Sequence, residues 1–162
     1  MHTINELRAS RHLEGRVEGI VVRGSPRAPA RNISETHAIA GVGLRDDRLG
    51  QRGEAELSTR QVTLIQHEHL AVIAQLARVE RVDAAALRRN LIVSGINLVA
   101  LRNLKVRIGE ALFEIVGPCH PCSRMEETIG RGGYAAMRGH GGMTAKILES
   151  GAIRIGDLIR VE

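Results

Sequence analysis

Residues 111–122 read Ala111-Leu112-Phe113-Glu114-Ile115-Val116-Gly117-Pro118-Cys119-His120-Pro121-Cys122, an apolar run followed by a Gly-Pro pair and then by two cysteines. The β-branched and apolar content of residues 111–116 predicts a strand, and the Gly-Pro pair is typical of a strand end. Cys119 and Cys122 are the only cysteines among 162 residues, and both therefore lie where this strand stops. The first functional hypothesis is sulfur chemistry at the end of a strand.

The residues after Cys122 indicate a short helix over residues 123–129. Ser123 is a suitable N-cap, and Glu126 three residues later would complete a capping box. The N–H groups of a helix N-terminus and the guanidinium of Arg124 both favour a thiolate, the form of cysteine that attacks electrophiles and binds metals. Cys119 has no such donor beside it in the sequence, so we expect Cys122 to be the reactive thiol.

Other uses of the two cysteines stay open. Free cysteine is often a small buried apolar side chain, whereas a disulfide across two residues would constrain little of the unfolded chain. The C-x-x-C spacing also occurs in thiol–disulfide redox proteins, but those place it near a βαβ pattern. Zinc binding by both cysteines with His67, His69 or His140 is a weaker alternative, because the chain has no second paired motif.

Several further segments have the composition of short strands. They are residues 17–23, 35–40, 61–65, 91–93, 105–108, 146–148 and 158–161. Many short strands with few helices predict a mainly β chain of the α+β class, built around a barrel.

Two helices and two loops complete the expected organisation. Residues 68–77 predict a helix with one apolar face, and residues 83–87 predict a second, short helix with Asp83 as its N-cap. Residues 41–53 contain four glycines and a charged run, which favours a long loop. The glycine-rich residues 130–142 predict either a surface loop or a backbone that approaches a ligand closely.

The composition fits one globular domain. The chain is 43% hydrophobic and 25% charged, and a chain of this length buries roughly 70% of its unfolded surface. The amino terminus has no signal-peptide pattern, and no apolar run approaches the roughly 20 residues needed to cross a bilayer. We therefore expect a cytoplasmic protein that does not enter a membrane.

The charge points to an anionic partner. The formal net charge is +5 and the isoelectric point is near 10.2, and Lys105 and Lys146 are the only lysines among 23 basic residues. Arginine binds phosphate and carboxylate oxygens bidentately. Aromatic residues make up 1% of the chain, so base stacking has almost nothing to use and nucleic acid is an improbable partner.

Six segments in order resemble the MOSC domain, found at the carboxyl end of molybdenum cofactor sulfurases, in amidoxime-reducing proteins and as free-standing bacterial proteins. They are Gly41-Val42-Gly43-Leu44 with Asp47-Arg48, Gln61-Val62-Thr63-Leu64-Ile65, Arg89-Asn90-Leu91-Ile92-Val93-Ser94-Gly95-Ile96, Gly117-Pro118-Cys119-His120-Pro121-Cys122-Ser123-Arg124-Met125, Arg138-Gly139-His140-Gly141-Gly142 and Gly151-Ala152-Ile153-Arg154-Ile155-Gly156-Asp157. The resemblance covers residues 15–162 and implies a MOSC-type β-barrel. Residues 1–14 are expected to form an N-terminal tail or short helix.

The resemblance also implies binding of molybdenum cofactor (molybdopterin), whose pterin dithiolene holds the metal. Cys122 is the matching cysteine, and it would ligate the molybdenum or carry persulfide sulfur. The positions that match family motifs and offer donors to the cofactor are Arg48, Arg89, Asn90 and Arg124. Pyridoxal phosphate belongs to the desulfurase module of the sulfurases, which this chain is expected to lack.

Structural roles for the same residues remain alternatives. Arg89 and Asn90 can instead bond backbone carbonyl groups at a helix end, and Arg48 can pair with a neighbouring aspartate. The early loop also departs from the family, which commonly has Gly-Asp-Arg-His where this chain has Asp46-Asp47-Arg48-Leu49.

The leading functional hypothesis is a free-standing MOSC domain. It would act as a small molybdenum-dependent reductase of N-hydroxylated compounds with an external electron donor, or as a carrier of cofactor or sulfur supplied by a donor protein. His120 or His140 would deliver protons in a reductase. Two alternatives are a C-x-x-C thiol–disulfide redox protein and a basic, non-catalytic binding module, and the sequence leaves open whether the chain is an enzyme.

Overall fold

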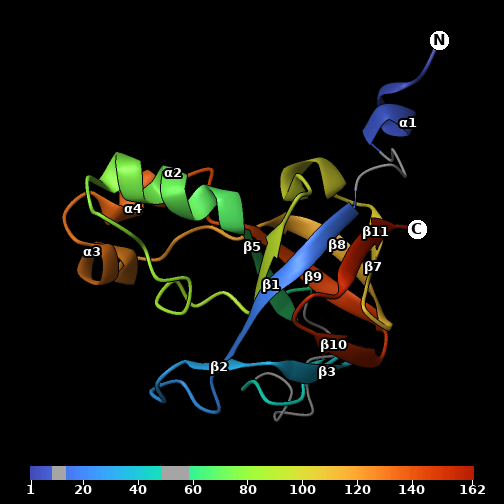
Figure 1. The fold of residues 1–162 in the computed structure, drawn as a ribbon, viewed down its shortest axis with the longest axis horizontal. Helices are drawn as coiled ribbons and strands as arrows, with labels where there is room; N and C mark the ends of the chain where they lie inside the picture. Colours follow the sequence, from blue (N-terminus) through green and yellow to red (C-terminus); the bar gives the residue numbers. More distant parts are fainter. Residues whose placement is uncertain (9–13, 49–58) are drawn as a thin grey trace.

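The computed structural model describes residues 1–8, 14–48 and 59–162, and a closed β-barrel lies at its centre (Figure 1). Around the ring the strands follow the order β1 (Glu14–Val22), β11 (Leu158–Val161), β7 (Lys105–Ile108), β8 (Ala111–Pro118), β9 (Met143–Glu149), β5 (Val62–Gln66) and β6 (Leu91–Ser94), which pairs back with β1. A short strand, β2 (Arg31–Ile33), extends the sheet beyond β1. The ring is antiparallel except between β5 and β6, and helix α2 (His67–Ala77) supplies the crossover that parallel neighbours need.

Neighbouring positions on the barrel strands enter two different cores. On β5, Leu64 lies in the barrel interior and Ile65 in a second core outside it. On β6, Leu91 and Val93 point inward while Ile92 points outward. Because successive side chains of a strand point to opposite faces, a strand buried on both faces must be apolar throughout, which explains these continuous apolar runs.

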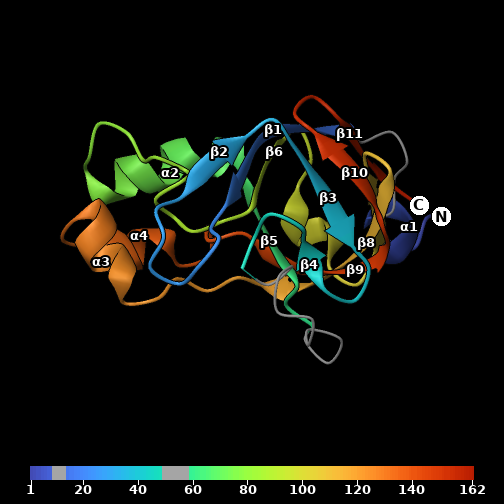
Figure 2. The ribbon, with the colours of Figure 1, turned by 90° about the horizontal axis from the view of Figure 1, so that it is seen from below.

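The second core separates the barrel from three helices, α2, α3 (Arg124–Ile129) and α4 (Gly133–Met137), which gather at one end of the molecule (Figures 1 and 2). Ile73 of α2, Met125 of α3 and Met137 of α4 are buried in it. The chain leaves β8 toward this helical end, so the two cysteines lie between the barrel and the helices.

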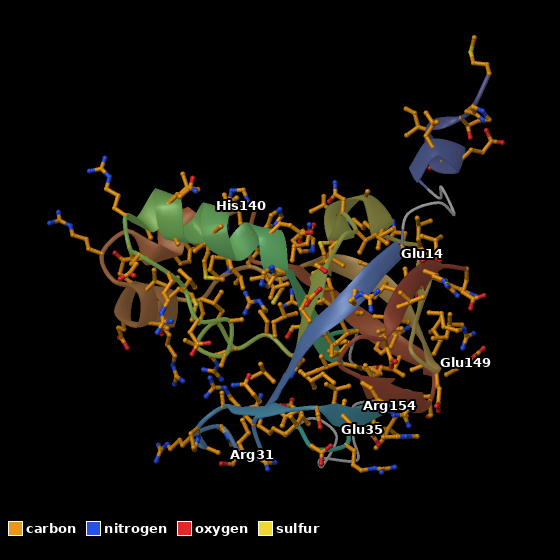
Figure 3. All side chains as sticks on the ribbon, in the orientation of Figure 1. Glu14, Arg31, Glu35, His140, Glu149 and Arg154 are labelled. Carbon is orange, nitrogen blue, oxygen red and sulfur yellow. The ribbon has the colours of Figure 1, made fainter. Side chains whose placement is uncertain are left out.

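A smaller sheet with the order β10 (Gly151–Arg154), β3 (Glu35–Ile39) and β4 (Gly43–Leu44) lies beside the barrel. Arg154 of β10 donates to Glu35 of β3 at 2.8 Å, at the end of the molecule remote from α2 (Figure 3). Helix α1 (Ile4–Arg8) and a 3₁₀ helix, η2 (Leu98–Leu101), complete the elements that the structure describes. Within the described ranges, no helix has the length and apolarity needed to span a membrane.

The predicted fold class, mainly β with a few short helices around a barrel, is confirmed. The strands predicted over residues 17–23, 35–40, 61–65, 91–93, 105–108, 111–116 and 158–161 and the helix over residues 68–77 are present, with ends that move by up to three residues. The strand predicted over residues 146–148 begins earlier, at Met143, because its first residues pair with β5 and β8.

One strand end is shifted and one predicted helix is absent. The Gly-Pro pair ends β8 as predicted, but it belongs to the strand, since Gly117 pairs with Thr144 and Pro118 with Met143 of β9. Residues 84–88 form turns rather than a helix, and the Asp83 carboxylate accepts from the N–H of Ala85 at 2.9 Å. The chain then leaves the turn at Arg88, whose φ of 61° is incompatible with continuing a helix.

The two predicted loops contain regular elements. Residues 41–53 include β4, which pairs with β3, while residues 49–53 lie outside the described ranges. Residues 130–142 include α4, whose Met137 is buried. Neither β2 nor β10 was predicted, since each is short and takes its conformation from its partner strand.

Candidate functional site

The two cysteines lie on the loop that follows β8, and their exposures differ. Cys119 is half-buried and Cys122 is exposed, while Pro121 between them is buried. The N–H of Cys119 donates to the carbonyl of Gly142 at 2.9 Å, which fixes the start of this loop against the end of the 139–142 loop. We call residues 119–122 the cysteine loop.

Helix α3 does not begin as the sequence suggested. Ser123 has helical dihedral angles (φ −56°, ψ −25°), and its side chain makes no capping hydrogen bond. Glu126 instead accepts from the N–H groups of Gly132 at 2.6 Å and Tyr134 at 3.0 Å, which pins the turn between α3 and α4. The carbonyl of Cys122 accepts from Met125 in the first turn, so the exposed thiol does lie at the start of α3.

Arg89 joins three segments behind the cysteine loop. Only 6% of its surface is exposed. Its Nε donates to the carbonyl of Gly141 at 2.6 Å, its Nη1 to Leu87 at 2.8 Å and its Nη2 to Cys119 at 3.2 Å. The side chain that the sequence suggested as a cofactor donor is thus engaged with backbone carbonyls.

The buried guanidinium also affects the thiols. Burial raises the pKa of the Cys119 thiol, and the nearby charges of Arg89 and Arg60 oppose that rise. Burial lowers the pKa of Arg89, and the negative forms of Cys119 and Cys122 oppose this. Arg89 is therefore a positive charge that acts on both cysteines.

The 139–142 loop can approach Arg89 only because it is rich in glycine. A Cβ on Gly141 would lie 2.5 Å from the carbonyl oxygen of Cys119 and 3.3 Å from Nη2 of Arg89. A Cβ on Gly142 would overlap the carbonyl of Leu64, and its φ of 89° disfavours other residues as well.

Arg89 also lines a cavity of about 140 Å³, on which four arginines converge. They are Arg23, Arg48, Arg88 and Arg89, and Asp47 is the only carboxylate among the residues that line it. We call this cavity the arginine pocket. Within the described residues, no salt bridge joins these four side chains to a carboxylate.

Arg23 is the most constrained of these arginines. Its Nη1 and Nη2 donate to the carbonyls of Ala28 and Ala85, both at 3.2 Å, whereas its buried Nε has no partner among the described groups. Burial and the neighbouring Arg88 lower the pKa of Arg23, and Asp47 opposes them. A buried donor without a partner is unfavourable, so the Nε–H of Arg23 favours the binding of a hydrogen-bond acceptor.

The other predicted donors surround the same pocket but differ in freedom. Asn90 lines it, yet its Oδ1 accepts from the Thr63 N–H at 3.1 Å and its Nδ2 donates to the carbonyl of Val21 at 3.2 Å. Arg48 lines the pocket with its side chain half-buried. Arg124, exposed at the start of α3, is close enough to act on the charge of Arg23.

The structure thus brings Arg48, Arg89 and Asn90 into one pocket, whereas Arg124 and Cys122 do not line it, and Arg89 connects the pocket to the cysteine loop. Sequence reasoning missed Arg23 and Arg88. Arg88 directly precedes the motif residues, and Arg23 follows a strand directly, so a search for basic residues at strand ends would have found both.

The histidines do not form a metal site with the cysteines. The ring of His140 packs edge-to-face on His69 of α2, with centroids 5.2 Å apart, and Figure 3 shows His140 beside that helix. Burial, together with His140, lowers the pKa of His69. In the part of the chain that the structure describes, no three His, Cys, Asp or Glu side chains are grouped to hold a metal, so the zinc hypothesis has no support there.

A second cavity, of about 280 Å³, lies against the cysteine loop and includes Cys119, His120 and Pro121 in its lining. Gly139, Gly141, Gly142 and Met143 line the opposite side, and Arg138 contributes a positive charge. Cys122 does not line this cavity. We call it the Cys119 cavity.

A family model described as the MOSC domain matches residues 25–160. The chain belongs to the MOSC domain family. MOSC domains are associated with molybdenum cofactor. Five of the six segments that suggested the family contribute residues to the cysteine loop or to one of the two cavities, whereas residues 151–157 begin in β10 of the small sheet. No curated protein matches the chain in sequence.

Solved structures share the MOSC fold of this chain. The YuaD protein from Bacillus subtilis superposes with a TM-score of 0.79 at 19% identity, covering 92% of this chain and 96% of that one. YiiM from Escherichia coli has a TM-score of 0.68 at 18% identity and covers 91% of this chain and 69% of that one. YiiM from Geobacillus stearothermophilus has a TM-score of 0.71 at 15% identity, with 91% and 75% covered. At these identities the likeness concerns the fold alone.

Proposed function

We propose that this MOSC domain binds molybdenum cofactor, with the cofactor's phosphate in the arginine pocket and Cys122 as a sulfur ligand of the metal. The observation that carries the proposal is the convergence of four arginines on one cavity with a single carboxylate. A pocket with this charge balance favours a dianion, because arginine forms short, charge-assisted bonds with phosphate oxygens.

The residues fit an anionic group in three respects. The Nε group of Arg23 is a buried donor without a partner, and Arg48 and Arg88 are free of salt bridges within the described residues. The cavity of about 140 Å³ is also far larger than the roughly 10–15 Å³ that one water molecule requires. Arg89 adds its positive charge to the pocket, while its own hydrogen bonds hold the surrounding backbone in place.

Cys122 is the better placed of the two thiols for ligation. It is exposed at the start of α3, whereas Cys119 is half-buried and faces the second cavity. When bound, the cofactor supplies two-electron chemistry at its metal. The chain's own residues bind the phosphate, present the thiol and hold a proton near the site at the exposed imidazole of His120.

Two uses of a bound cofactor follow. With an external electron donor the domain would reduce small N-hydroxylated compounds, and with a donor protein it would carry cofactor or sulfur. We place this activity in the cytoplasm. A basic module without cofactor is the competing function, and its binding would weaken with salt without any metal or pterin present.

The test is cofactor content. Wild type, Cys122→Ser, Arg88→Gln and the control Arg131→Gln, an exposed arginine of the α3–α4 turn, are expressed in a host rich in molybdenum cofactor and purified without oxygen. We expect near-stoichiometric molybdenum and pterin in wild type and control, with losses in the other two. No molybdenum or pterin in wild type would refute the proposal.

A further inference from the structure

The two cysteines of the C-x-x-C motif have complementary positions. Cys122 is open to solvent and to a large partner, whereas Cys119 is half-buried and lines the Cys119 cavity. A donor protein can therefore reach Cys122 directly, while Cys119 is accessible mainly from inside the loop. Cys122 is therefore suited to receive a group from a donor, and Cys119 to react with that group afterwards.

The backbone of Cys119 is fixed in both directions. Its N–H donates to Gly142 at 2.9 Å and its carbonyl accepts from Nη2 of Arg89 at 3.2 Å. Pro121, buried between the cysteines, limits the freedom of the turn that joins them. The charge of Cys122 acts on Cys119, and that of Arg89 acts on both.

We propose that Cys119 resolves a persulfide carried on Cys122 and releases its outer sulfur as hydrosulfide. The inference rests on the sulfur-carrier form of the proposed function. The sulfur of Cys119 attacks the inner sulfur of the Cys122 persulfide, a Cys119–Cys122 disulfide bond forms, and the bond between inner and outer sulfur breaks. The outer sulfur leaves with the electron pair of the broken bond as hydrosulfide, and the proton of the Cys119 thiol passes to water. Counted from two free thiols and a zero-valent outer sulfur, the cysteine pair loses two electrons and the outer sulfur gains them, and an external dithiol reduces the disulfide for the next cycle.

The surroundings suit the release of a small anion. The Cys119 cavity of about 280 Å³ has room for hydrosulfide and several waters. Arg138 in its lining and Arg89 behind the loop supply positive charge for the departing anion. The cavity that Cys119 lines thus offers the departing hydrosulfide a space with positive charge nearby.

The experiment follows the persulfide on the cofactor-free full chain, reduced and then briefly exposed to inorganic polysulfide. Wild type, Cys119→Ser and Cys122→Ser are freed of excess reagent and sampled over time by intact-mass and peptide mass spectrometry, with a sulfide electrode in parallel. Serine is nearly isosteric with cysteine, and thermal unfolding checks that each variant is folded. Cys119→Ala provides a second variant that cannot attack.

In wild type we expect the mass gained from one sulfur atom on Cys122 to disappear as the 119–122 disulfide and hydrosulfide appear together. In Cys119→Ser and Cys119→Ala the persulfide should last at least about tenfold longer, because no resolving thiol is present. Cys122→Ser should yield no disulfide. A wild-type persulfide as durable as that of Cys119→Ser, or hydrosulfide released without the disulfide, would overturn the proposal.

Cofactor content separates this inference from the proposed function, and it is measured on the same variants expressed in the cofactor-rich host and purified without oxygen. Reduced Cys119→Ser should retain molybdenum and pterin as wild type does. If no variant holds cofactor while wild type still resolves its persulfide, the proposed cofactor site fails and the sulfur step stands. If cofactor is held but the persulfide is not resolved, only the role of Cys119 fails.

Discussion

Replacing Arg89 by methionine should destabilise the fold far more than the same change at its neighbour Arg88. Arg89 is 6% exposed, and its guanidinium donates to the carbonyls of Leu87, Gly141 and Cys119. Methionine can fill much of the space but carries no donor. The substitution therefore leaves three carbonyl groups without their protein partner.

The magnitude follows from these three bonds. A hydrogen bond to a charged group contributes about 1.5–3 kcal/mol, so the three together contribute roughly 4–9 kcal/mol. Removing the buried cation also removes its desolvation penalty, which is on the order of several kcal/mol, and carbonyls next to a cavity can regain water. The expected net loss is about 3–5 kcal/mol, a large part of the roughly 5–15 kcal/mol that stabilises a domain.

Urea unfolding followed by circular dichroism measures this loss. Arg89→Lys should recover little of it, because an ammonium group cannot make the three divergent bonds of a guanidinium. Arg88→Met should change the free energy of unfolding by no more than about 0.5 kcal/mol, because Arg88 is only half-buried and makes no salt bridge within the described residues.

The opposite pattern would refute the reasoning. If Arg89→Met lay within about 1 kcal/mol of wild type, the three bonds would not hold the loops together, and Arg89 would be free to bind the cofactor as the sequence suggested. Cofactor content provides a second, independent measurement, because Arg88→Met should lose cofactor while it stays folded.

Three further predictions concern the core, the glycine loop and the histidine pair. Phe113 is the only phenylalanine and is fully buried in the barrel. Phe113→Ala should lower the free energy of unfolding, measured with urea, by about 3–5 kcal/mol. A decrease of less than about 1 kcal/mol would contradict its place in the core. Gly142→Ala should disrupt the fold, because its Cβ overlaps a carbonyl, whereas Gly139→Ala, with φ of 83° and open space around it, should cost only about 1 kcal/mol; equal losses would contradict the close approach. Because the pKa of His69 is held below its usual 6.5 by burial and by His140, protonation favours the unfolded chain, so wild type should lose stability as the pH falls below about 6.5. His69→Asn should lose less over that interval in urea midpoints, and an equal loss would contradict the lowered pKa.

The sequence was most reliable where local pattern and burial agree. Residues 111–116 are dense in residues that suit a strand, and their alternating inward positions fill the barrel, so local preference and tertiary packing favour the same structure. Helix α2 was predictable for the same reason, because Leu70, Ile73 and Ala77 fall on the face that packs on the second core. Residues 41–53 and 130–142 were predicted less well, because glycine weakens the local signal while pairing with β3 and packing of Met137 fix the backbone from outside.

Capping at Ser123 illustrates a different limit. The sequence contains a complete capping box, Ser123 with Glu126, but two N–H groups of the next turn compete for the same carboxylate. Glu126 accepts both, from Gly132 and Tyr134, and the box does not form. A local motif predicts a contact only when no group brought close by the fold offers a better one.

The run Arg88-Arg89-Asn90 shows why the sequence could locate the site but could not assign a role to each of its residues. Three consecutive polar residues suggest one set of ligand donors, yet a chain that enters a buried strand must send neighbouring side chains in different directions. Arg89 turns inward to three carbonyls and Asn90 ties β5 to β1, which leaves Arg88 directed to the pocket. An anion in this pocket must then be held mainly by arginines from separate segments, so its affinity depends on the loops that Arg89 fastens together. Loss of Arg89 should therefore weaken cofactor binding through geometry, and loss of Arg88 through charge.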